Sequence, residues 1–434
     1  MNKPSLAWFS GKNENLKILF ATFLFICLRS PKLLIFGRLF AEEGTVYFQT
    51  AWSSGFWSAF LAPHQGYYSL LDNAVAAITV YLIPLSWVAF AFTFSALLLL
   101  LLMVYVVITC EIFETTQVKL LAALICVISP SLEVWLTLED CQFCLAVCAA
   151  IILLSDEKKR QWVRGLTLLL AGLTGPVSCA FLPFYWIRAV RRKTKPAVVQ
   201  ALILTASTSV EIWTLLHALR SGERALISLE RLRWLGPVFL IKTVTLTLAT
   251  RLSFFLFLRL LLHHYSTSLF ILCWLLATLG FIFLARQARI NGSTSSFLFL
   301  LACWSFLFAY AGIAESSLAL LGAANRYFFV PDLLIWLMIV LNYQQYKKSS
   351  SRQSSKVPYY LLVLIIASGL IDSAGYWKKA QNITPAWRPQ IARWRADPTT
   401  PISVSPTTWP VQLILGNHRH AAPPSSFSGP RKTP

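Results

Sequence analysis

Two adjacent carboxylates, Glu42 and Glu43, stand after the first apolar stretch of the chain, residues 16–36, and before an aromatic segment. A carboxylate near a membrane surface can act as a general base, because it can accept the proton of an attacking hydroxyl group. A neighbouring like charge raises the pKa of one member of such a pair. The other interpretation is a solvated acidic pair in a loop, and the two residues alone leave both open.

A second acidic pair, Glu139-Asp140, precedes an apolar segment that begins at Cys141. These carboxylates are candidates to bind a substrate hydroxyl group or a metal ion. The alternative is that they complement the positive end of a helix macrodipole. Glu133 is a weaker candidate of the same kind. His64 is a candidate to position an acceptor or a phosphate group, although a lone loop histidine usually does neither.

The elements that would position these groups are transmembrane helices. Hydrophobic residues make up 56% of the 434 residues and charged residues 13%, whereas a soluble domain carries about 25% charged residues. A buried helix of a soluble protein could explain one long apolar run, but not several that approach the length of a bilayer core. We therefore expect an all-α polytopic transmembrane bundle of about ten to twelve helices. The apolar runs are residues 89–109, 198–219, 268–285, 296–314, 327–343 and the shorter 358–371.

The formal charge of +20 does not indicate nucleic-acid binding. The basic residues come in short groups between apolar runs, as cytoplasmic loops do under the positive-inside rule. A basic tail or a basic patch interleaved with aromatic residues, as in nucleic-acid-binding proteins, does not stand apart from this pattern. The groups lie around Lys158-Lys159-Arg160, residues 188–195 and residues 347–356.

The other sequence signals narrow the class of protein. Eight of the nine cysteines, all except Cys141, lie inside or at the edge of apolar stretches, so they are expected to be small apolar helix residues. The pair Cys141/Cys144 has no second pair to complete a metal site. The sequence has no phosphate loop of the Walker type, no zinc-type ligand cluster and no Asp-x-Asp pair. These absences argue against an ATPase, a metalloprotease and a glycosyltransferase of the soluble type.

The charge pattern predicts the orientation of the chain. Lys3, Lys12 and Lys17 place the N-terminus in the cytoplasm, and residues 16–36 read as a retained first helix. Residues 37–68 then form the first extracytoplasmic loop. Four aromatic residues in this loop recur with the spacing of one helix face and predict a helix that lies in the membrane interface. They are Trp52, Phe56, Trp57 and Phe60.

Two crossings are expected next, at residues 70–83 and 87–109, with Pro84 at the turn. After these crossings the chain is on the outer side, so if the loop around Lys158 is cytoplasmic, residues 118–154 must cross an odd number of times. We therefore expect residues 118–128 to dip into the membrane or lie flat, while residues 141–154 cross.

The second half contains two irregular segments. Residues 166–187 are interrupted by Thr174-Gly175-Pro176 and are expected to form a short hairpin whose tip reaches the outer half of the membrane. Residues 238–262 contain three basic residues and are expected to be interfacial or to line a cavity. These are Lys242, Arg251 and Arg259. We assign residues 1–372 to the membrane domain and residues 373–434 to a polar, Pro- and Trp-rich tail on the outer side.

The layout resembles the GT-C class of membrane glycosyltransferases, which use polyprenyl- or dolichyl-phosphate sugars. That class carries one or two acidic residues in the first extracytoplasmic loop, followed by juxtamembrane helices, and Phe40-Ala41-Glu42-Glu43-Gly44 occupies this place. Several short stretches are also similar to bacterial members of the class. They are Pro63-His64-Gln65-Gly66-Tyr67, Leu173-Thr174-Gly175-Pro176, Asn325-Arg326-Tyr327, and Trp394-Arg395-Ala396-Asp397-Pro398 through Trp409-Pro410.

The resemblance implies an inverting sugar transfer in which Glu42 or Glu43 activates an acceptor hydroxyl group. The leaving lipid phosphate would need cations, and arginine suits it because its planar fork can hold two phosphate oxygens. Snorkelling to lipid headgroups is the alternative for these arginines. The phosphate candidates are Arg224, Arg231, Arg233 and Arg326, and the other substrate-binding candidates are His64, Tyr67, Glu139, Asp140 and Tyr327.

The implied partners are membrane lipids, a polyprenyl-phosphate-linked sugar and a glycan or lipid acceptor, without nucleic acid, in a bacterial-type plasma membrane. Some enzymes of the class use a divalent metal and others do not, so no cofactor is assigned. Two other functions remain open. A flippase for lipid-linked saccharides predicts inverted repeats or paired broken helices. A glycan polymerase or ligase places its working residues in a large late loop, whereas residues 315–325 are short and apolar.

Overall fold

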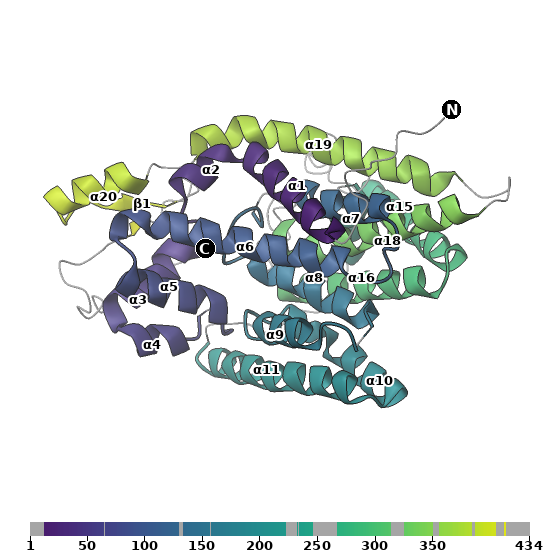
Figure 1. The fold of residues 1–434 in the computed structure, drawn as a ribbon, viewed down its shortest axis with the longest axis horizontal. Coiled ribbons are helices and arrows are strands. Elements are labelled where there is room, and N and C mark those ends of the chain that lie inside the picture. The colour runs from purple at the N-terminus through teal and green to yellow at the C-terminus, as the bar shows by residue number, and fades with distance from the viewer. Residues whose placement is uncertain are drawn as a thin grey trace.

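The computed structural model describes residues 13–64, 66–129, 133–156, 158–222, 232, 234–245, 267–313, 325–349, 356–383, 387–404 and 412–413. Within these residues the chain is an all-α bundle (Figure 1), apart from one pair of two-residue strands. Six helices are long and apolar enough to cross a membrane, and each overlaps one of the six apolar runs of the sequence. They are α6 (Val88–Ile108), α11 (Lys195–Arg220), α15 (Thr267–Ile290), α16 (Ser293–Gly312), α18 (Phe329–Lys348) and α19 (Val357–Ile383).

Shorter elements complete the bundle. The first loop holds the π-helix η2 (Glu43–Phe48), and residues 235–245 hold a second one, η6 (Phe239–Thr245). The other helices are α1 (Glu14–Arg29), α2 (Pro31–Phe36), α3 (Gln49–Ser54), α4 (Phe56–Leu61), α5 (Leu70–Leu82), η3 (Leu85–Trp87), α7 (Thr116–Ile128), α8 (Cys141–Leu154), α9 (Gln161–Gly172), η4 (Ser178–Phe181), α10 (Leu182–Arg192), α12 (Leu235–Val238), η7 (Asn325–Phe328) and α20 (Trp387–Ala396). The strands are β1 (Ile402–Ser403) and β2 (Gln412–Leu413).

The core is built around α18 and α8. Every residue of α18 from Phe329 to Gln344 is buried, and α7, α8, α16 and α19 all pack against this helix. Helix α8 is buried along almost its whole length, and it lies between α6 and α9. A helix enclosed on all sides must be largely apolar all round, and these two helices are so in their central turns, while the polar residues Asp332 and Asn342 lie nearer the ends of α18.

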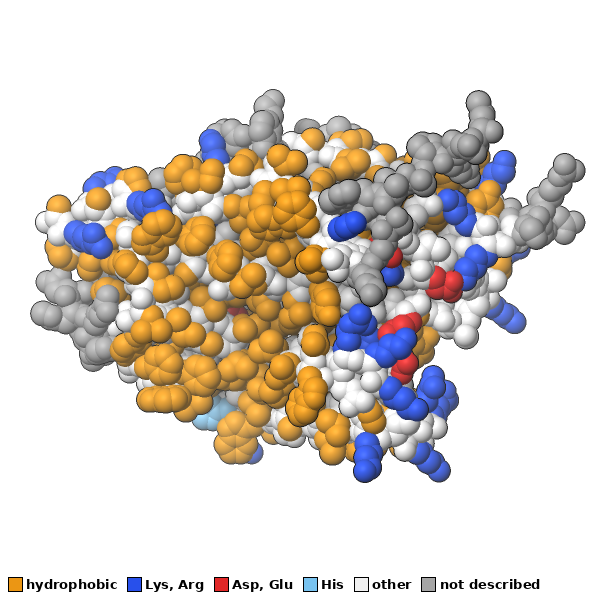
Figure 2. Space-filling view, viewed as in Figure 1, with side chains coloured by type: hydrophobic (Ala, Val, Ile, Leu, Met, Phe, Trp, Pro, Cys, Tyr) orange, Lys and Arg blue, Asp and Glu red, His pale blue; other side chains and the backbone are white. Residues whose placement is uncertain are grey.

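The outer surface is apolar around the middle of the bundle. In Figure 2 hydrophobic side chains cover the centre of the molecule, while most Lys and Arg side chains gather at the right-hand end and a smaller group lies over α20. Large side chains such as Leu98, Leu275 and Leu307 are about half exposed. An apolar surface of this extent is unfavourable in water but matches a hydrocarbon core. The chain is therefore a membrane protein.

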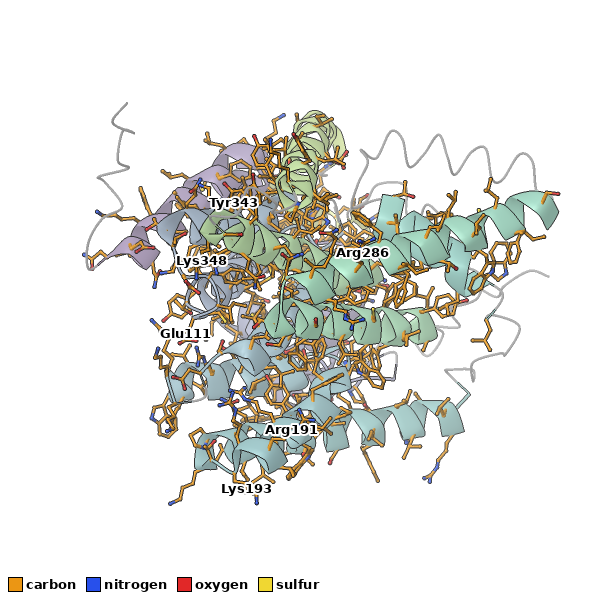
Figure 3. The ribbon with its side chains drawn as sticks, turned by 90° about the vertical axis from the view of Figure 1, so that its right-hand side faces the viewer. Glu111, Arg191, Lys193, Arg286, Tyr343 and Lys348 are labelled. Carbon is orange, nitrogen blue, oxygen red and sulfur yellow. The ribbon has the colours of Figure 1, made fainter. Side chains whose placement is uncertain are left out.

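The basic end of the bundle (Figure 3) is where α1 and α7 begin and α6, α8 and α18 end. Lys119 of α7 pairs with Glu14 of α1 at 3.3 Å. Glu111, after α6, lies 3.4 Å from Arg164, and Lys348 pairs with Glu114. These ion pairs join helix ends that are far apart in the sequence and hold them beside one another.

The opposite end, here the first-loop end, is formed by η2, α3, α4, residues 133–140 and α20. The expected hairpin also reaches it. Helices α9 and α10 are its arms, and at its tip the Leu173 carbonyl accepts a hydrogen bond from the Leu70 N–H at 2.7 Å. The described part of the tail lies here too, because Trp387 donates to the carbonyl of Leu85 at 2.7 Å. Helix α19 continues to Ile383, so the assigned boundary at 372 falls inside a helix.

The membrane path predicted for residues 70–128 is wrong at two helices, and the two errors together leave the predicted sides of the later loops unchanged. Helix α5 does not cross: it starts beside Leu173, and α6 then begins at the same end, where the Arg38 N–H donates to Thr93 at 3.0 Å. Its 13 residues span only about 20 Å. Helix α7 does not lie flat: it runs beside α1 from Lys119 at the basic end to Val127, whose carbonyl accepts from Arg29. The distribution of charges among the loops cannot reveal such a pair of errors, because the number of crossings before the loop around Lys158 is the same in both paths.

The expected single interfacial helix at residues 52–60 is also divided. Gly55 has φ of 88° and separates α3 from α4, because a left-handed residue ends a helix. Trp52 is buried against Phe48 and Trp394, whereas Trp57 is 70% exposed. Only α4 therefore presents an aromatic residue outward, and α3 belongs to the core of the first-loop end.

We expect the two ends to lie on opposite sides of the membrane. A cysteine at Ser54, exposed in α3, should react with a membrane-impermeant thiol reagent in intact cells, while one at Lys193, exposed after α10, should react only after permeabilisation. Wild type supplies the background, since seven of its nine free cysteines are buried. The reverse labelling pattern would overturn the orientation that the positive-inside rule predicts.

Candidate active site

The exit from α2 is fixed by a close approach to α6. Gly37 has φ of 68°, and a Cβ atom there would lie 2.2 Å from the Phe90 backbone nitrogen, so only glycine fits. This contact brings Arg38 into the bundle, where its Nη2 donates to the carbonyl of Trp135 at 2.8 Å and to the hydroxyl of Thr137 at 2.7 Å. Arg38 thereby ties the start of the first loop to the segment that precedes α8.

Glu43 makes the second connection between these two segments. Its side chain is 1% exposed, and its two oxygens accept hydrogen bonds from the N–H groups of Phe40 at 2.7 Å and Leu138 at 2.5 Å. Burial raises the pKa of Glu43 to about 8, although these N–H groups and Arg38 oppose the shift. Glu43 is therefore an internal acceptor for buried backbone groups and does not face a substrate.

Glu42 faces the other way, toward the segment that precedes α8. Its side chain is half-buried and lies within hydrogen-bonding reach of the Glu139 carboxyl group. Its Oε2 atom is buried and has no donor within reach in the described part of the chain. Ala41, immediately before it, has φ of 42°, and Leu136 on the opposing segment has φ of 51°. Non-glycine residues in this region are strained, and such strain often occurs at functional sites.

Arg326 brings the only guanidinium group of η7 into the acidic cluster formed by Glu42, Glu139 and Asp140. Its Nη1 lies 3.6 Å from both Glu139 Oε1 and Asp140 Oδ1, and its side chain is 21% exposed. The Arg326 N–H donates to Glu133 at 3.3 Å. Next to it, Asn325 accepts a 2.5 Å hydrogen bond from Lys242 of η6. The arginine is thus anchored at its backbone while its tip is shared between two carboxylates.

The carboxylates of this acidic cluster outnumber the cation that they face. Burial raises the pKa of Asp140 to about 7, although Arg326 opposes this shift. The pKa of Glu139 is raised well above its usual range, first by burial and then by its neighbours Glu42 and Asp140. Near neutral pH the cluster therefore retains a proton, because three buried charges beside one guanidinium group are unfavourable.

An aromatic wall stands beside the cluster. His64 and Tyr67 form an antiparallel β-bridge, and the Tyr47 hydroxyl of η2 lies 3.4 Å from that of Tyr67. The His64 ring packs edge-on against Tyr47, with centroids 5.0 Å apart. Burial lowers the pKa of His64 to about 4, so this imidazole is neutral at pH 7. Its buried Nε2 atom has no partner among the described residues.

The hairpin tip packs against the chain directly after the aromatic wall. Ser69 pairs with Thr174 in a β-bridge, and the Gly175 N–H donates to the Tyr68 carbonyl at 3.0 Å. The Tyr68 N–H in turn donates to Glu211 of α11 at 3.2 Å. The sequence motif around Thr174-Gly175-Pro176 therefore contributes structure to the site: it holds the segment that carries His64 and Tyr67.

Most of the predicted site residues lie together. Glu42, Glu139, Asp140 and Arg326 form the acidic cluster, Tyr327 stacks beside Arg326 at 5.4 Å, and the His64–Tyr67 wall adjoins them. Glu43 is close by but faces the backbone. Three predicted phosphate-binding residues lie outside the described residues: Arg224, Arg231 and Arg233.

Sequence reasoning missed three contributors to the site: Arg38, Tyr47 and Asp72. Asp72 lies in α5 and accepts a 2.5 Å hydrogen bond from Ser69, which holds the start of the helix. A charged residue in a short apolar helix and an arginine after a glycine were the available signals. As for a metal, the described residues contain no group of three or more His, Cys, Asp or Glu that could hold one.

Glu43 predicts how stability depends on pH. Its folded pKa of about 8 lies above its ordinary value of 4.5, so between pH 4.5 and 8 the native state binds more protons than the unfolded state. Stability should be highest below pH 4.5 and fall as the pH rises through 8, with Asp140 acting in the same direction up to about pH 7. Thermal unfolding of the detergent-solubilised protein between pH 5 and 8 measures this fall.

The matched variant is Glu43→Gln, which cannot ionise and has only one acceptor oxygen for two N–H groups. At pH 5 the protonated Glu43 also has one carbonyl acceptor, so the two proteins should be close in stability there. Toward pH 8 wild type alone loses stability, so Glu43→Gln should become the more stable protein. Glu114→Gln, at the exposed surface of the basic end, controls for the loss of a carboxyl group. Equal pH slopes for wild type and Glu43→Gln would contradict the assignment.

Comparison with known proteins leaves the site to be interpreted from its own geometry. A scan against protein-family models, a search of curated proteins and a search of solved structures each find no match.

Proposed function

We propose that this chain is a membrane glycosyltransferase of the GT-C type, which transfers a sugar from a polyprenyl-phosphate donor to an extracytoplasmic acceptor with inversion. The observation that supports it most is the position of Glu42, a half-buried carboxylate directly after the first crossing that faces Glu139, Asp140 and Arg326. A base and a cation within one cluster, at the membrane surface, are what a transfer from a lipid phosphate requires.

The proposed fold follows from the two ends of the bundle. Helix α1, the consecutive helices α6 to α11, and helices α15, α16, α18 and α19 extend between the basic end and the first-loop end. If each of these crosses, the number of crossings falls within the predicted range of about ten to twelve. The N-terminus then lies in the cytoplasm and α20 on the outer side, with the acidic cluster at the outer surface.

In the proposed reaction Glu42 is the general base. Its carboxylate accepts the proton of the acceptor hydroxyl group as the hydroxyl oxygen forms a bond to the anomeric carbon. The bond from that carbon to the phosphate oxygen breaks, and the electron pair leaves with the lipid phosphate. Attack opposite to the leaving group inverts the anomeric centre. We assign the base role to Glu42 and not to Glu43, because both oxygens of Glu43 accept hydrogen bonds from backbone N–H groups.

Arg326 is the proposed phosphate ligand among the described residues. At 3.6 Å its guanidinium group is an ion-pair partner of Glu139 and Asp140 but is too far for short charge-assisted hydrogen bonds. Its remaining N–H groups are available to the developing charge on the leaving phosphate. The neutral imidazole of His64, with its buried Nε2, and the hydroxyl of Tyr67 form the wall on which the acceptor or the sugar is oriented.

We expect Glu42→Gln to reduce transfer by about 10²- to 10⁴-fold, the usual contribution of a general base, and to leave the protein folded in the membrane. Glycans and lipid-linked sugars from cells that carry each variant measure the effect. Loss of one sugar, with its polyprenyl-phosphate donor accumulating, would also name the sugar.

Glu43→Gln is the matched control, with the same chemical change at the next residue. It should retain transfer at a temperature where it is folded. Unchanged glycans in a folded Glu42→Gln variant would contradict the proposal. Whole lipid-linked oligosaccharides retained on the cytoplasmic side would instead favour a flippase.

A further inference from the structure

The contact between Glu42 and Glu139 needs a proton. Their side chains lie within hydrogen-bonding reach of each other, although ionised carboxylates are acceptors only. Each also has a buried Oε2 atom without a donor among the described residues. A single proton placed between the two groups converts one acceptor into a donor and so supplies the missing hydrogen bond. Without it, two negative charges would repel each other at short range in a buried site.

Glu139 is the member of the pair that is least able to ionise. It is 4% exposed, whereas Glu42 is half-buried and reaches the surface. Its Oε1 atom has Arg326 as an ion-pair partner at 3.6 Å, but that guanidinium group is shared with Asp140 at the same distance. The cation is therefore not sufficient for both carboxylates. The pKa of Glu139, raised mainly by burial, agrees with this geometry.

We propose that Glu139 is a positioning residue, which holds one proton in common with Glu42 and donates it as a hydrogen bond to the carboxylate that acts as base. The consequence for catalysis rests on the proposed function, whereas the shared proton itself does not. The pair has three states, with two, one or no protons. The state with one proton is the active one, because Glu42 is then ionised and at the same time held in place.

The balance of the step is simple. The acceptor O–H bond breaks and its proton moves to Glu42, the bond from oxygen to the anomeric carbon forms, and the bond to the phosphate breaks. The pair then carries two protons, and one is released to solvent through the half-exposed Glu42 before the next turnover. With no proton on the pair, Glu42 loses its hydrogen-bond donor and is repelled by Glu139.

Other charged or titratable groups surround the pair. They come from the first loop, the segment that precedes α8, α5 and η7. Their presence means that the apparent pKa values belong to the pair and not to either residue alone. These groups are Arg38, Glu43, Tyr47, Tyr67, Asp72, Glu133, Asp140, Arg326 and Tyr327.

The pH profile of transfer tests the role of Glu139. For wild type, kcat/KM should follow a bell-shaped curve: it rises as the pair loses its first proton and falls as the pair loses its second. In Glu139→Gln the side-chain amide donates permanently to Glu42, so the alkaline limb should disappear while the acid limb remains. Asp140→Asn removes the same charge from the cluster but leaves the shared proton, so both limbs should remain. An alkaline limb that survives unchanged in Glu139→Gln would overturn the proposal.

An infrared difference measurement tests the proton without any assay of transfer. Because Glu43, with a pKa of about 8, is also protonated at pH 7, each variant is compared with wild type by a difference spectrum. The carbonyl band of the carboxyl group that holds the shared proton should be present for purified wild type at pH 7. It should be lost in Glu139→Gln and also in Glu42→Gln, because a glutamine at either position donates to the remaining carboxylate. Asp140→Asn should retain the Glu42–Glu139 band.

The two proposals can therefore fail separately. If the band is lost in Glu139→Gln and Glu42→Gln but wild type transfers no sugar, the shared proton is supported and the glycosyltransferase is rejected. Transfer that depends on Glu42, with a band unaffected by Glu139→Gln, would reject the shared proton alone.

Discussion

The hydrogen bonds of one buried carboxyl group, that of Glu43, hold the first loop against the segment that precedes α8. Both segments are irregular backbone inside a protein that has little water around it, so their N–H groups need internal acceptors. Glu43 accepts one from Phe40 in its own loop and one from Leu138 in the other segment. Arg38 supplies the complementary donors, to the Trp135 carbonyl and Thr137. These four hydrogen bonds hold the two segments against each other, and in this arrangement the Glu42 side chain faces Glu139.

The charge of the acidic cluster follows from this arrangement. A fold that presses Glu42 against the turn before α8 also brings Glu139 and Asp140 out of water, and it offers Arg326 as the nearby cation. Removing a charge from water is costly unless it is paired. Burial, together with the like charges nearby, raises the pKa values of Glu139 and Asp140, and a bound proton relieves the imbalance. His64 is neutral because its own burial lowers its pKa. Acid–base chemistry is therefore a property of the whole cluster.

The sequence predicts the long helices well, because a run such as residues 89–109 has one physical explanation. It predicts the composition of the site in part: Glu42, Glu139, Asp140 and Arg326 were recognised as scarce charged residues near helix ends. It could not show that they meet, since this depends on Arg38 and Glu43 binding backbone groups about a hundred residues away. It also could not separate Glu42 from Glu43, whose difference lies only in which way each side chain points.

The shorter helices were predicted poorly for a related reason. Helix α7 is only 13 residues long and was expected to lie flat, yet it runs between the two ends. At its far end, which Ser129 caps, Arg29 of α1 donates to a carbonyl of the last turn and also lies over the Trp135 ring. Length alone does not decide whether a helix crosses when neighbouring helices shield its ends from lipid. The tolerance of short and irregular elements is what allows a polar site to be built at the membrane surface.

The position of the site within the bundle bears on the choice between transfer and transport. Buried polar groups lie toward both ends of the bundle, with the acidic cluster at the first-loop end and residues such as Asn342 toward the basic end, whereas α18 is apolar and fully buried from Leu333 to Leu341 between them. A saccharide that moved between the ends along this helix would exchange its hydration for leucine, isoleucine and methionine side chains, which costs several kcal/mol for each unpaired hydroxyl group, about 2–7 kcal/mol. A substrate that stays at the surface, with its lipid in the membrane and its sugar at Glu42, meets no such barrier. The distribution of polarity along α18 therefore favours chemistry at one face of the membrane over passage through it.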